Sequence, residues 1–189
     1  MSTAHSKQKM TAAEYLDWER QQVERHEFYD DEVFSQARGT RRHSLIGTNT
    51  GCVIGNLLAG DDCQVHGSDM RIEIEATGSY VYPDVSVVCP PIEAKGDDVI
   101  SNPVLVVEVL SPSTEDFDRG TKFGYYRQIP SLRDYLVISQ DQARIEHHFL
   151  NEGELWSLRD VEGVDEVLQL ASLRHDLPLT EVYSKVEFD

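Results

Sequence analysis

The fold is decided by one stretch of the sequence, Val104-Leu105-Val106-Val107-Glu108-Val109-Leu110-Ser111-Pro112-Ser113-Thr114. Residues 103–110 are almost continuously apolar, which is typical of a strand buried on both faces. Ser113 or Thr114 then predicts the cap of a helix that ends at Gln128, ahead of a proline. A buried strand followed directly by a helix favours an α/β fold.

The rest of the chain predicts elements on both sides of this strand. Thr11 and Glu14 form a T-x-x-E capping box that starts a helix over residues 11–22. A hairpin is predicted over 26–36 and a long helix over 41–60. Further strands are predicted at 70–75, 83–88, 134–139, 143–150 and 154–159, whereas 168–189 is only weakly patterned. The order α-β-β-β-α-β predicts a mixed sheet flanked by helices, with a C-terminal β-hairpin, in a single domain spanning residues 1–189.

The predicted long helix carries Gly47, Gly51 and Gly55 four residues apart, which gives it one smooth strip. Each interior glycine costs a helix about 1 kcal/mol relative to alanine, so the close approach of another element must offset that cost. Either the strip packs tightly on a sheet or it forms the helix–helix seam of a homodimer.

The charge of the chain is extreme, because 34 acidic residues against 17 Lys and Arg give a net charge of -17. Such a field argues against a protein that coats nucleic acid or an anionic membrane. Residues 35–60 are the exception, since they hold Arg38, Arg41 and Arg42 and no acid. These three arginines are the predicted contacts to nucleic acid.

The cysteines and the apolar runs bear on localisation. Cys52, Cys63 and Cys89 are an odd number without a C-x-x-C pair, so we expect no disulfide framework and a reducing, cytoplasmic setting. The N-terminal residues lack an apolar stretch, and the longest aliphatic run is far short of a membrane span. We therefore expect a soluble cytoplasmic protein.

Glu108 is the most informative single position, because a carboxylate in a buried strand must be paired, protonated or bound to a cation. The alternative is a glutamate at an edge or strand end that reaches solvent. Asp84, after Pro83 at the start of another strand, can lie at the same end of the sheet. Two such carboxylates repel each other unless a hard cation such as Mg²⁺ or Mn²⁺ bridges them.

The predicted helix after this strand presents Asp118, Lys122 and Tyr126 on one face, since they are four residues apart. Lys122 either makes a surface ion pair with Asp118 or directs its ammonium at the carboxylate pair. His43, beside the arginines, and Glu27, in the predicted hairpin, are weaker candidates for the same site.

Taken together, Pro83-Asp84, the block Glu108-Val109-Leu110-Ser111-Pro112-Ser113-Thr114 and the D-x-x-x-K-x-x-x-Y pattern of residues 118–126 resemble the Uma2 (Uma-two) family of restriction endonuclease-like proteins. That family belongs to the PD-(D/E)XK nuclease superfamily. The similarity extends from the first helix to the strand at 134–138. It implies a restriction endonuclease-like fold and a Mg²⁺- or Mn²⁺-dependent endonuclease that hydrolyses phosphodiester bonds of DNA.

The resemblance also implies roles for individual residues. Asp84 and Glu108 would be catalytic residues and, with the backbone carbonyl of Val109, the metal ligands. Leu110 stands where the superfamily pattern expects lysine, so Lys122 would supply the catalytic ammonium from the helix. The accessory residues would be Glu27, His43, Asp118 and Tyr126.

A second function remains open on the sequence. The acidic net charge and the glycine strip also fit a catalytically inactive nuclease-like binding or assembly module, which has kept the scaffold without turnover.

Overall fold

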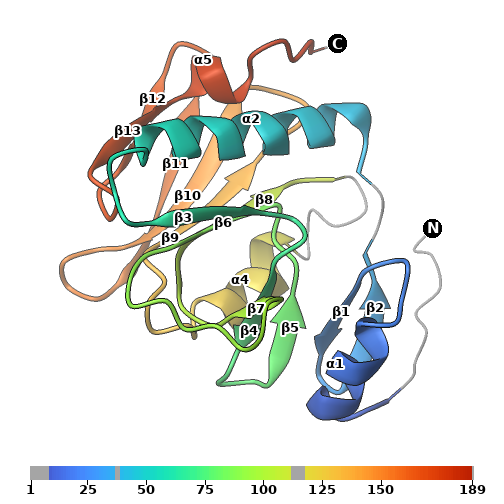
Figure 1. Ribbon diagram of the computed structural model, residues 1–189. Coiled ribbons are helices and arrows are strands. Elements are labelled where there is room, and N and C mark those ends of the chain that lie inside the picture. Colours follow the sequence, from blue (N-terminus) through green and yellow to red (C-terminus); the bar gives the residue numbers. More distant parts are fainter. Residues whose placement is uncertain (1–8, 37–38, 112–117, 189) are drawn as a thin grey trace.

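The computed structural model describes residues 9–36, 39–111 and 118–188 (Figure 1). The elements are, in order, α1 (Ala12–Glu19), β1 (His26–Tyr29), β2 (Glu32–Ser35), α2 (Arg41–Leu57), β3 (Gln64–Gly67), β4 (Arg71–Ile74), β5 (Ser79–Val81), β6 (Val85–Val88), β7 (Val99–Ile100), β8 (Pro103–Val109), the π-helical turn η1 (Asp118–Lys122), α4 (Phe123–Tyr126), β9 (Asp134–Ile138), β10 (Arg144–Leu150), β11 (Trp156–Glu162), β12 (Val167–Leu170), β13 (His175–Pro178) and α5 (Leu179–Val182). The predicted α/β fold with a mixed sheet flanked by helices is therefore confirmed.

The central sheet has six strands in the order β11-β10-β9-β8-β6-β3. Strands β8 and β9 pair in parallel, and the other neighbours pair antiparallel, so the sheet is mixed. Figure 1 shows α2 lying along one face, with the C-terminal hairpin and α5 beside it, and α4 on the other side of the sheet. Strand β8 is buried on both faces, as its apolar sequence predicts.

Alternate residues of β8 enter two different cores. Leu105, Val107 and Val109 pack with α2 and the C-terminal elements. Val106 and Leu110 pack on the opposite side with Tyr126 of α4. Because side chains alternate along a strand, Glu108 faces this second side, as the sequence predicts.

The glycine strip of α2 packs on the sheet at two of its positions. A Cβ added to Gly47 would lie 3.9 Å from the Cβ of Asp84, and one added to Gly51 would lie 3.7 Å from Val85. A Cβ on Gly55 would meet nothing within 4 Å. The sheet-packing interpretation therefore holds for Gly47 and Gly51, and α2 ends at Leu57 rather than at residue 60.

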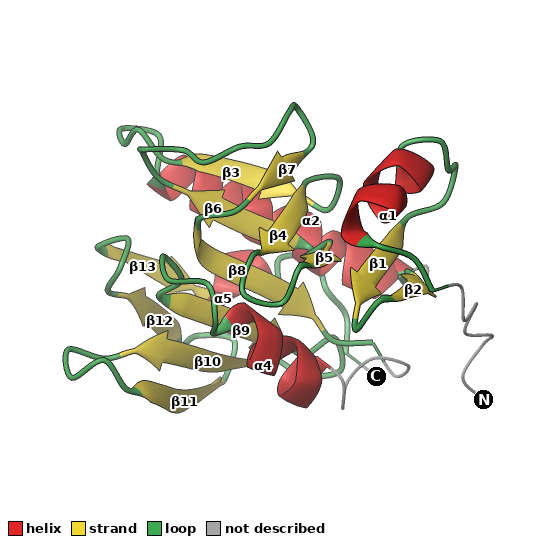
Figure 2. Ribbon diagram, turned by 90° about the horizontal axis from the view of Figure 1, so that it is seen from below, coloured by secondary structure: helices red, strands yellow, loops and turns green. Residues whose placement is uncertain are grey.

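A second sheet, in the order β2-β1-β5-β4-β7, carries α1 (Figure 2). The capping box of Thr11 and Glu14 is formed, although α1 ends at Glu19, earlier than predicted. The β1–β2 hairpin turns at Asp30 and Asp31, which both have positive φ angles of 53° and 60°. Asp tolerates this left-handed conformation better than most residues, which explains why the pair forms the turn.

The alternating sequence of β4 predicts one apolar and one charged face, and both faces are buried. Arg71 lies over the rings of Tyr15 and Tyr82, and Glu73 accepts a hydrogen bond from Tyr80. The second sheet therefore has a buried charged face, which alternation alone does not reveal.

The helix predicted to end at Gln128 is shorter and irregular. Its predicted cap, Ser113 or Thr114, lies outside the described residues. The described part begins with the π-helical turn η1 and continues as α4, which ends at Tyr126. The hairpin β10–β11 is confirmed, and the weakly patterned tail forms β12, β13 and α5.

The prediction that the cysteines do not pair is wrong. Cys63 and Cys89 form a disulfide with their Cα atoms 4.1 Å apart. They flank the pair Gln64–Val88 of the β3–β6 ladder, so they are cross-strand neighbours although 26 residues separate them in sequence. The spacing of cysteines along the sequence does not reveal a contact that depends on the pairing of two strands. The third cysteine, Cys52, is free.

No helix within the described ranges is long and apolar enough to cross a membrane.

Candidate active site

The candidate active site lies where β8 ends between β6 and β9. Glu108 is buried, with 4% of its surface exposed. Its Oε1 atom accepts hydrogen bonds from the hydroxyl of Tyr126 at 2.9 Å and from Nζ of Lys122 at 3.1 Å. The edge-strand alternative for Glu108 is therefore excluded, because β8 is a central strand and the carboxylate is paired.

Lys122 is surrounded by carboxylates. Its Nζ atom lies 3.1 Å from Glu27, 3.1 Å from Glu108 and 3.5 Å from Asp118. Burial alone would lower the pKa of Lys122, but the attraction of Glu108, Glu27 and Asp118 outweighs burial and raises that pKa well above its ordinary value. The ammonium is therefore charged and directed at the carboxylates, and the surface ion-pair alternative does not hold.

Three elements bring these groups together. Glu27 comes from β1 in the second sheet, Glu108 from β8 in the central sheet, and Lys122 from the π-helical turn η1. Asp118 and Lys122 are the first and last residues of that turn, and both are buried. Tyr135 on β9 donates its hydroxyl to the backbone carbonyl of Asp118 at 2.8 Å, which fixes the turn on the sheet.

We call Glu27, Asp84, Glu108, Asp118 and Lys122 the carboxylate–lysine cluster. Burial raises the pKa of Glu108 well above its ordinary value, and the charges of Asp118, Asp84 and Glu27 add to this rise against the opposing effect of Lys122. Burial and the Glu108 carboxylate also raise the pKa of Tyr126, so its hydroxyl stays a donor. The cluster thus brings four acidic side chains and one ammonium together, and Glu27, Glu108 and Asp118 are buried.

Asp84 lies directly before β6 and beside Glu108, because the ladder pairs Val85 with Val107. Its Oδ2 atom accepts a hydrogen bond of 2.7 Å from the backbone N–H of Val109, and its backbone N–H bonds the carbonyl of Val107. The predicted meeting of Asp84 with the end of β8 is therefore present in the structure.

His43 reaches Asp84 from the first turn of α2. Its Nε2 atom lies 3.4 Å from Oδ2 of Asp84. Burial acts to lower the pKa of His43, but the interaction with Asp84 is stronger in sum and raises that pKa above its ordinary value. The backbone N–H of His43 is capped by Thr40, so the helix start and the side chain are positioned together.

The donor set fits a hard divalent cation. The carboxylates of Asp84 and Glu108 and the carbonyl of Val109 are oxygen ligands of the kind that Mg²⁺ and Mn²⁺ prefer. A cation there would also neutralise part of the excess negative charge. In the part of the chain that the structure describes, no three His, Cys, Asp or Glu side chains are grouped so that they could hold a metal ion. The predicted set needs only two side chains, because its third ligand is a backbone carbonyl.

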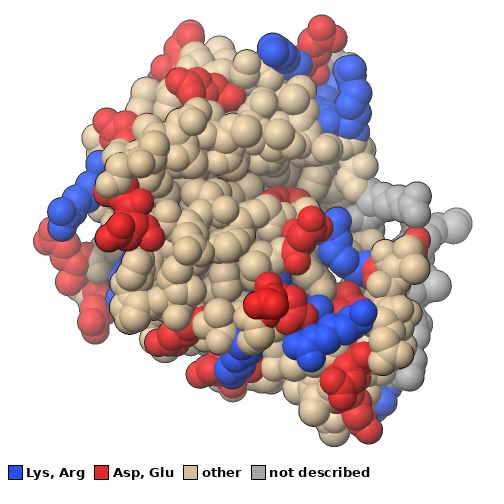
Figure 3. All heavy atoms as spheres, viewed as in Figure 1, with Lys and Arg blue, Asp and Glu red and all other residues tan. Residues whose placement is uncertain are grey.

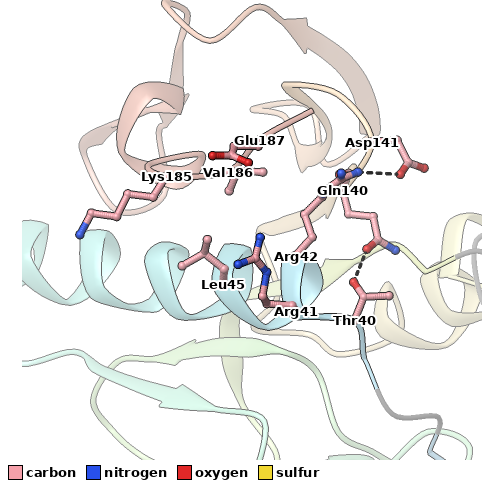
Figure 4. Close-up of a pocket in the computed structure, with 9 residues that line it drawn as sticks. All are labelled: Thr40, Arg41, Arg42, Leu45, Gln140, Asp141, Lys185, Val186 and Glu187. Atoms are coloured by element: carbon pink, nitrogen blue, oxygen red, sulfur yellow. Dashed lines mark hydrogen bonds and ion pairs between the residues drawn. The ribbon is translucent and has the colours of Figure 1, made fainter. Parts of the chain in front are cut away.

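Arg41 and Arg42, which are predicted to contact nucleic acid, are the first two residues of α2. Arg42 donates to the carbonyl of Gln140 at 3.3 Å and lies 3.6 Å from Asp141. Arg41 is exposed and lines a cavity with Arg42 (Figure 4). Arg38 lies outside the described residues.

Sequence reasoning missed two residues that shape the site. The first is Tyr135, whose hydroxyl holds the π-helical turn. The second is Tyr82, which directly precedes Pro83 and Asp84 in the sequence and whose backbone N–H donates to Glu27 at 3.2 Å. The signal for Tyr135 was its hydroxyl in an otherwise apolar strand, since a buried hydroxyl needs a partner. No signal in the sequence marks the backbone contact of Tyr82.

Comparisons with known proteins agree with this architecture. Residues 12–180 match the model of the Uma2 family, described as "Putative restriction endonuclease". The protein slr1290 of Synechocystis sp. (strain ATCC 27184 / PCC 6803 / Kazusa) is 38% identical over 180 residues, which cover 95% of this chain and 94% of that protein. A second protein of the same strain, sll1609, is 34% identical over 167 residues, which cover 87% of this chain and 94% of that protein.

A solved structure shares the fold. It is described as "a putative nuclease belonging to DUF820" from Anabaena variabilis ATCC 29413 and superposes with a TM-score of 0.77 at 14% sequence identity. The superposition covers 94% of this chain and 99% of the other. At this identity the likeness concerns the fold alone.

Proposed function

The chain belongs to the Uma2 restriction endonuclease-like family, and on that premise we propose that it is a metal-dependent endonuclease acting on DNA. The observation that carries the proposal is the carboxylate–lysine cluster. It places a charged ammonium 3.1 Å from a buried carboxylate at the end of a central strand, beside a second carboxylate bound to the same strand. A buried acid whose pKa is shifted by both burial and specific charged neighbours, as that of Glu108 is, is a candidate functional residue.

In this proposal Asp84, Glu108 and the carbonyl of Val109 would hold Mg²⁺ or Mn²⁺. The chemistry supplied by a bound cation is polarisation of a phosphate oxygen and a lowered pKa of a coordinated water. Overall, the water oxygen bonds to phosphorus, one phosphorus–oxygen ester bond breaks, and the departing oxygen receives a proton.

The residues of the chain would orient and stabilise this reaction. Lys122 would hold the attacking water and stabilise the negative charge that develops on the phosphate. Tyr126 fixes the rotamer of Glu108, and His43 together with the Val109 N–H fixes that of Asp84. Glu27 and Asp118 keep Lys122 charged and in place. We therefore assign these four residues accessory roles.

Incubation of the purified protein with supercoiled plasmid DNA and Mn²⁺ tests the proposal. We expect nicking by the wild type, loss of nicking in Asp84→Ala and Lys122→Ala, and loss of nicking on chelation of the metal. Asp62→Ala is the matched control, because Asp62 is exposed and lies in the loop between α2 and β3. Equal nicking by the wild type and Asp84→Ala would overturn the proposal, since a contaminating nuclease would then explain the activity.

The inactive-module alternative has its own signature in the same experiment. Folded wild type that binds Mn²⁺ through Glu108 but leaves the plasmid intact would contradict the nuclease and favour the module.

A further inference from the structure

A cavity of about 410 Å³ lies at the start of α2. It is bounded by the start of α2, by the turn between β9 and β10, and by residues 185–187 after α5 (Figure 4). Three segments far apart in the sequence therefore converge on one hollow.

One wall of the cavity is connected to the strand that carries Glu108. Thr40 donates its hydroxyl to Oε1 of Gln140 at 2.6 Å, and Nε2 of Gln140 donates to the carbonyl of Leu110 at 2.9 Å. Leu110 follows Glu108 by two residues, which is about 7 Å along an extended chain. The cavity wall is therefore connected through Gln140 to the end of the strand that carries Glu108.

The C-terminal wall is fixed on the same helix. Asn49 of α2 donates to the carbonyls of Val182 and Ser184 at 3.1 and 2.8 Å. The hydroxyl of Tyr183 bonds the backbone of Ser139 and Arg144 across the β9–β10 turn. The segment that carries residues 185–187 is thus held against both other walls.

Among the described residues, three basic and two acidic side chains line the cavity. Arg41, Arg42 and Lys185 line it together with two acids, Asp141 and Glu187. In Figure 4 the guanidinium of Arg41 points into the space between α2 and the C-terminal segment, and the ammonium of Lys185 lies farther along α2. Figure 3 shows Lys and Arg side chains gathered at this end of α2, on a chain whose net charge is -17.

We propose that this cavity is a subsite for a phosphate of the DNA backbone, bound by Arg41 with Arg42 and Lys185 beside it. The inference rests on the proposed function, because it assigns the subsite to the DNA strand that enters the carboxylate–lysine cluster. The planar guanidinium group of arginine can donate two parallel hydrogen bonds to the oxygens of one phosphate. The ammonium of a lysine cannot reproduce this bidentate geometry. Arg42 is already oriented by Gln140 and Asp141, so Arg41 is the main adaptable contact.

Fluorescence anisotropy with a short labelled DNA duplex tests the subsite, in buffer with chelator so that catalysis plays no part. We expect Arg41→Gln to weaken binding several-fold and to lower the slope of log K against log salt concentration by about one phosphate contact. Lys185→Gln should weaken binding less. Glu187→Gln should strengthen binding, because it removes a repelling carboxylate from the same cavity. Arg174→Gln, an exposed arginine on the β12–β13 turn, is the charge-matched control and should change neither quantity.

The outcomes separate the subsite from the nuclease proposal. Unchanged affinity and salt slope in Arg41→Gln would overturn the subsite even if the plasmid is nicked. An Arg41-dependent affinity supports the subsite even if no nicking occurs. Calorimetric binding of inorganic phosphate that depends on Arg41, with unchanged duplex affinity, would assign the cavity to a small anion and overturn the DNA subsite.

Discussion

Two buried groups of charged side chains differ in their balance of charge. The arginine–tyrosine network of the second sheet consists of Glu19, His26, Arg71, Tyr82 and Asp98. Glu19 accepts from both His26 and the Tyr82 hydroxyl, while Arg71 donates to that hydroxyl and lies 3.5 Å from Asp98. Acids and bases are matched there, as expected of a cluster that holds α1 on its sheet.

The carboxylate–lysine cluster is not matched in this way, since the one ammonium of Lys122 contacts the three acids Glu27, Glu108 and Asp118. Both groups contain buried charged side chains, so burial of charge does not by itself distinguish a candidate site from a structural network. The difference lies in the surplus of acid, which raises the pKa of Glu108 and leaves negative charge that a cation would neutralise.

Among the substitutions that test this contrast, removal of the Lys122 ammonium should have the largest effect on the free energy of unfolding. Lys122→Met leaves buried carboxylates without their cation, so we expect a loss of about 3–5 kcal/mol of unfolding free energy at neutral pH. Without Lys122 the pKa of Glu108 would rise further above its unfolded value. The deficit should therefore shrink as the pH falls, because protonated acids no longer repel one another.

Urea unfolding at several pH values measures this effect. Arg71→Met is the counterpart in the balanced network and should also cost stability, but added Mn²⁺ should restore only Lys122→Met. Equal recovery of both variants with Mn²⁺ would show that the contrast between the clusters has no bearing on metal binding.

Glu108→Gln should have a smaller effect, and one of opposite sign. The folded-state pKa of Glu108 lies well above its ordinary value, so its ionisation costs stability increasingly as the pH rises past the unfolded pKa. The amide removes that cost, while Lys122 keeps Glu27 and Asp118 as partners. We expect the variant to be about 0.5–2 kcal/mol more stable above neutral pH and inactive.

The matched substitution in the balanced network should destabilise instead. Glu19→Gln leaves part of its hydrogen bonding to His26 and Tyr82 unmade, at a cost of about 1–3 kcal/mol. Denaturation midpoints at pH values on both sides of neutrality compare the two variants. A stability loss in Glu108→Gln as large as that in Glu19→Gln would indicate that Glu108 is a structural partner.

The smallest effect is expected at the rim of the cluster. Asp84→Asn keeps an acceptor for the Val109 N–H but removes the charge beside His43. Because the interaction with Asp84 raises the pKa of His43 against the effect of burial, loss of that charge should lower the pKa. Titration of the His43 ring signals by NMR measures the shift, and an unchanged pKa would place His43 and Asp84 apart in solution.

The elements that sequence predicted best are those in which one local signal dominates. The continuous apolar run around Glu108 indicated a buried central strand, and the acid inside that run indicated the candidate site. The four-residue spacing of Asp118 and Lys122 placed them together even though the turn is π-helical.

The features that sequence missed depend on contacts between distant segments. Cys63 meets Cys89 only because β3 and β6 pair, and the burial of Arg71 requires α1 to cover the second sheet. The weakly patterned tail becomes β12, β13 and α5 because Leu168, Leu177 and Val182 enter the core beside α2. Periodicity within one segment carries no information about such partners.

The central claim is that the excess of acidic side chains at the end of β8 forms a cation-binding site. Calorimetric titration of the protein with Mn²⁺ tests this claim most directly. We predict binding by the wild type that is lost in Glu108→Gln and kept in Glu73→Gln, a buried acid of the second sheet that already pairs with Lys95. Binding of equal strength in the wild type and Glu108→Gln would contradict the claim.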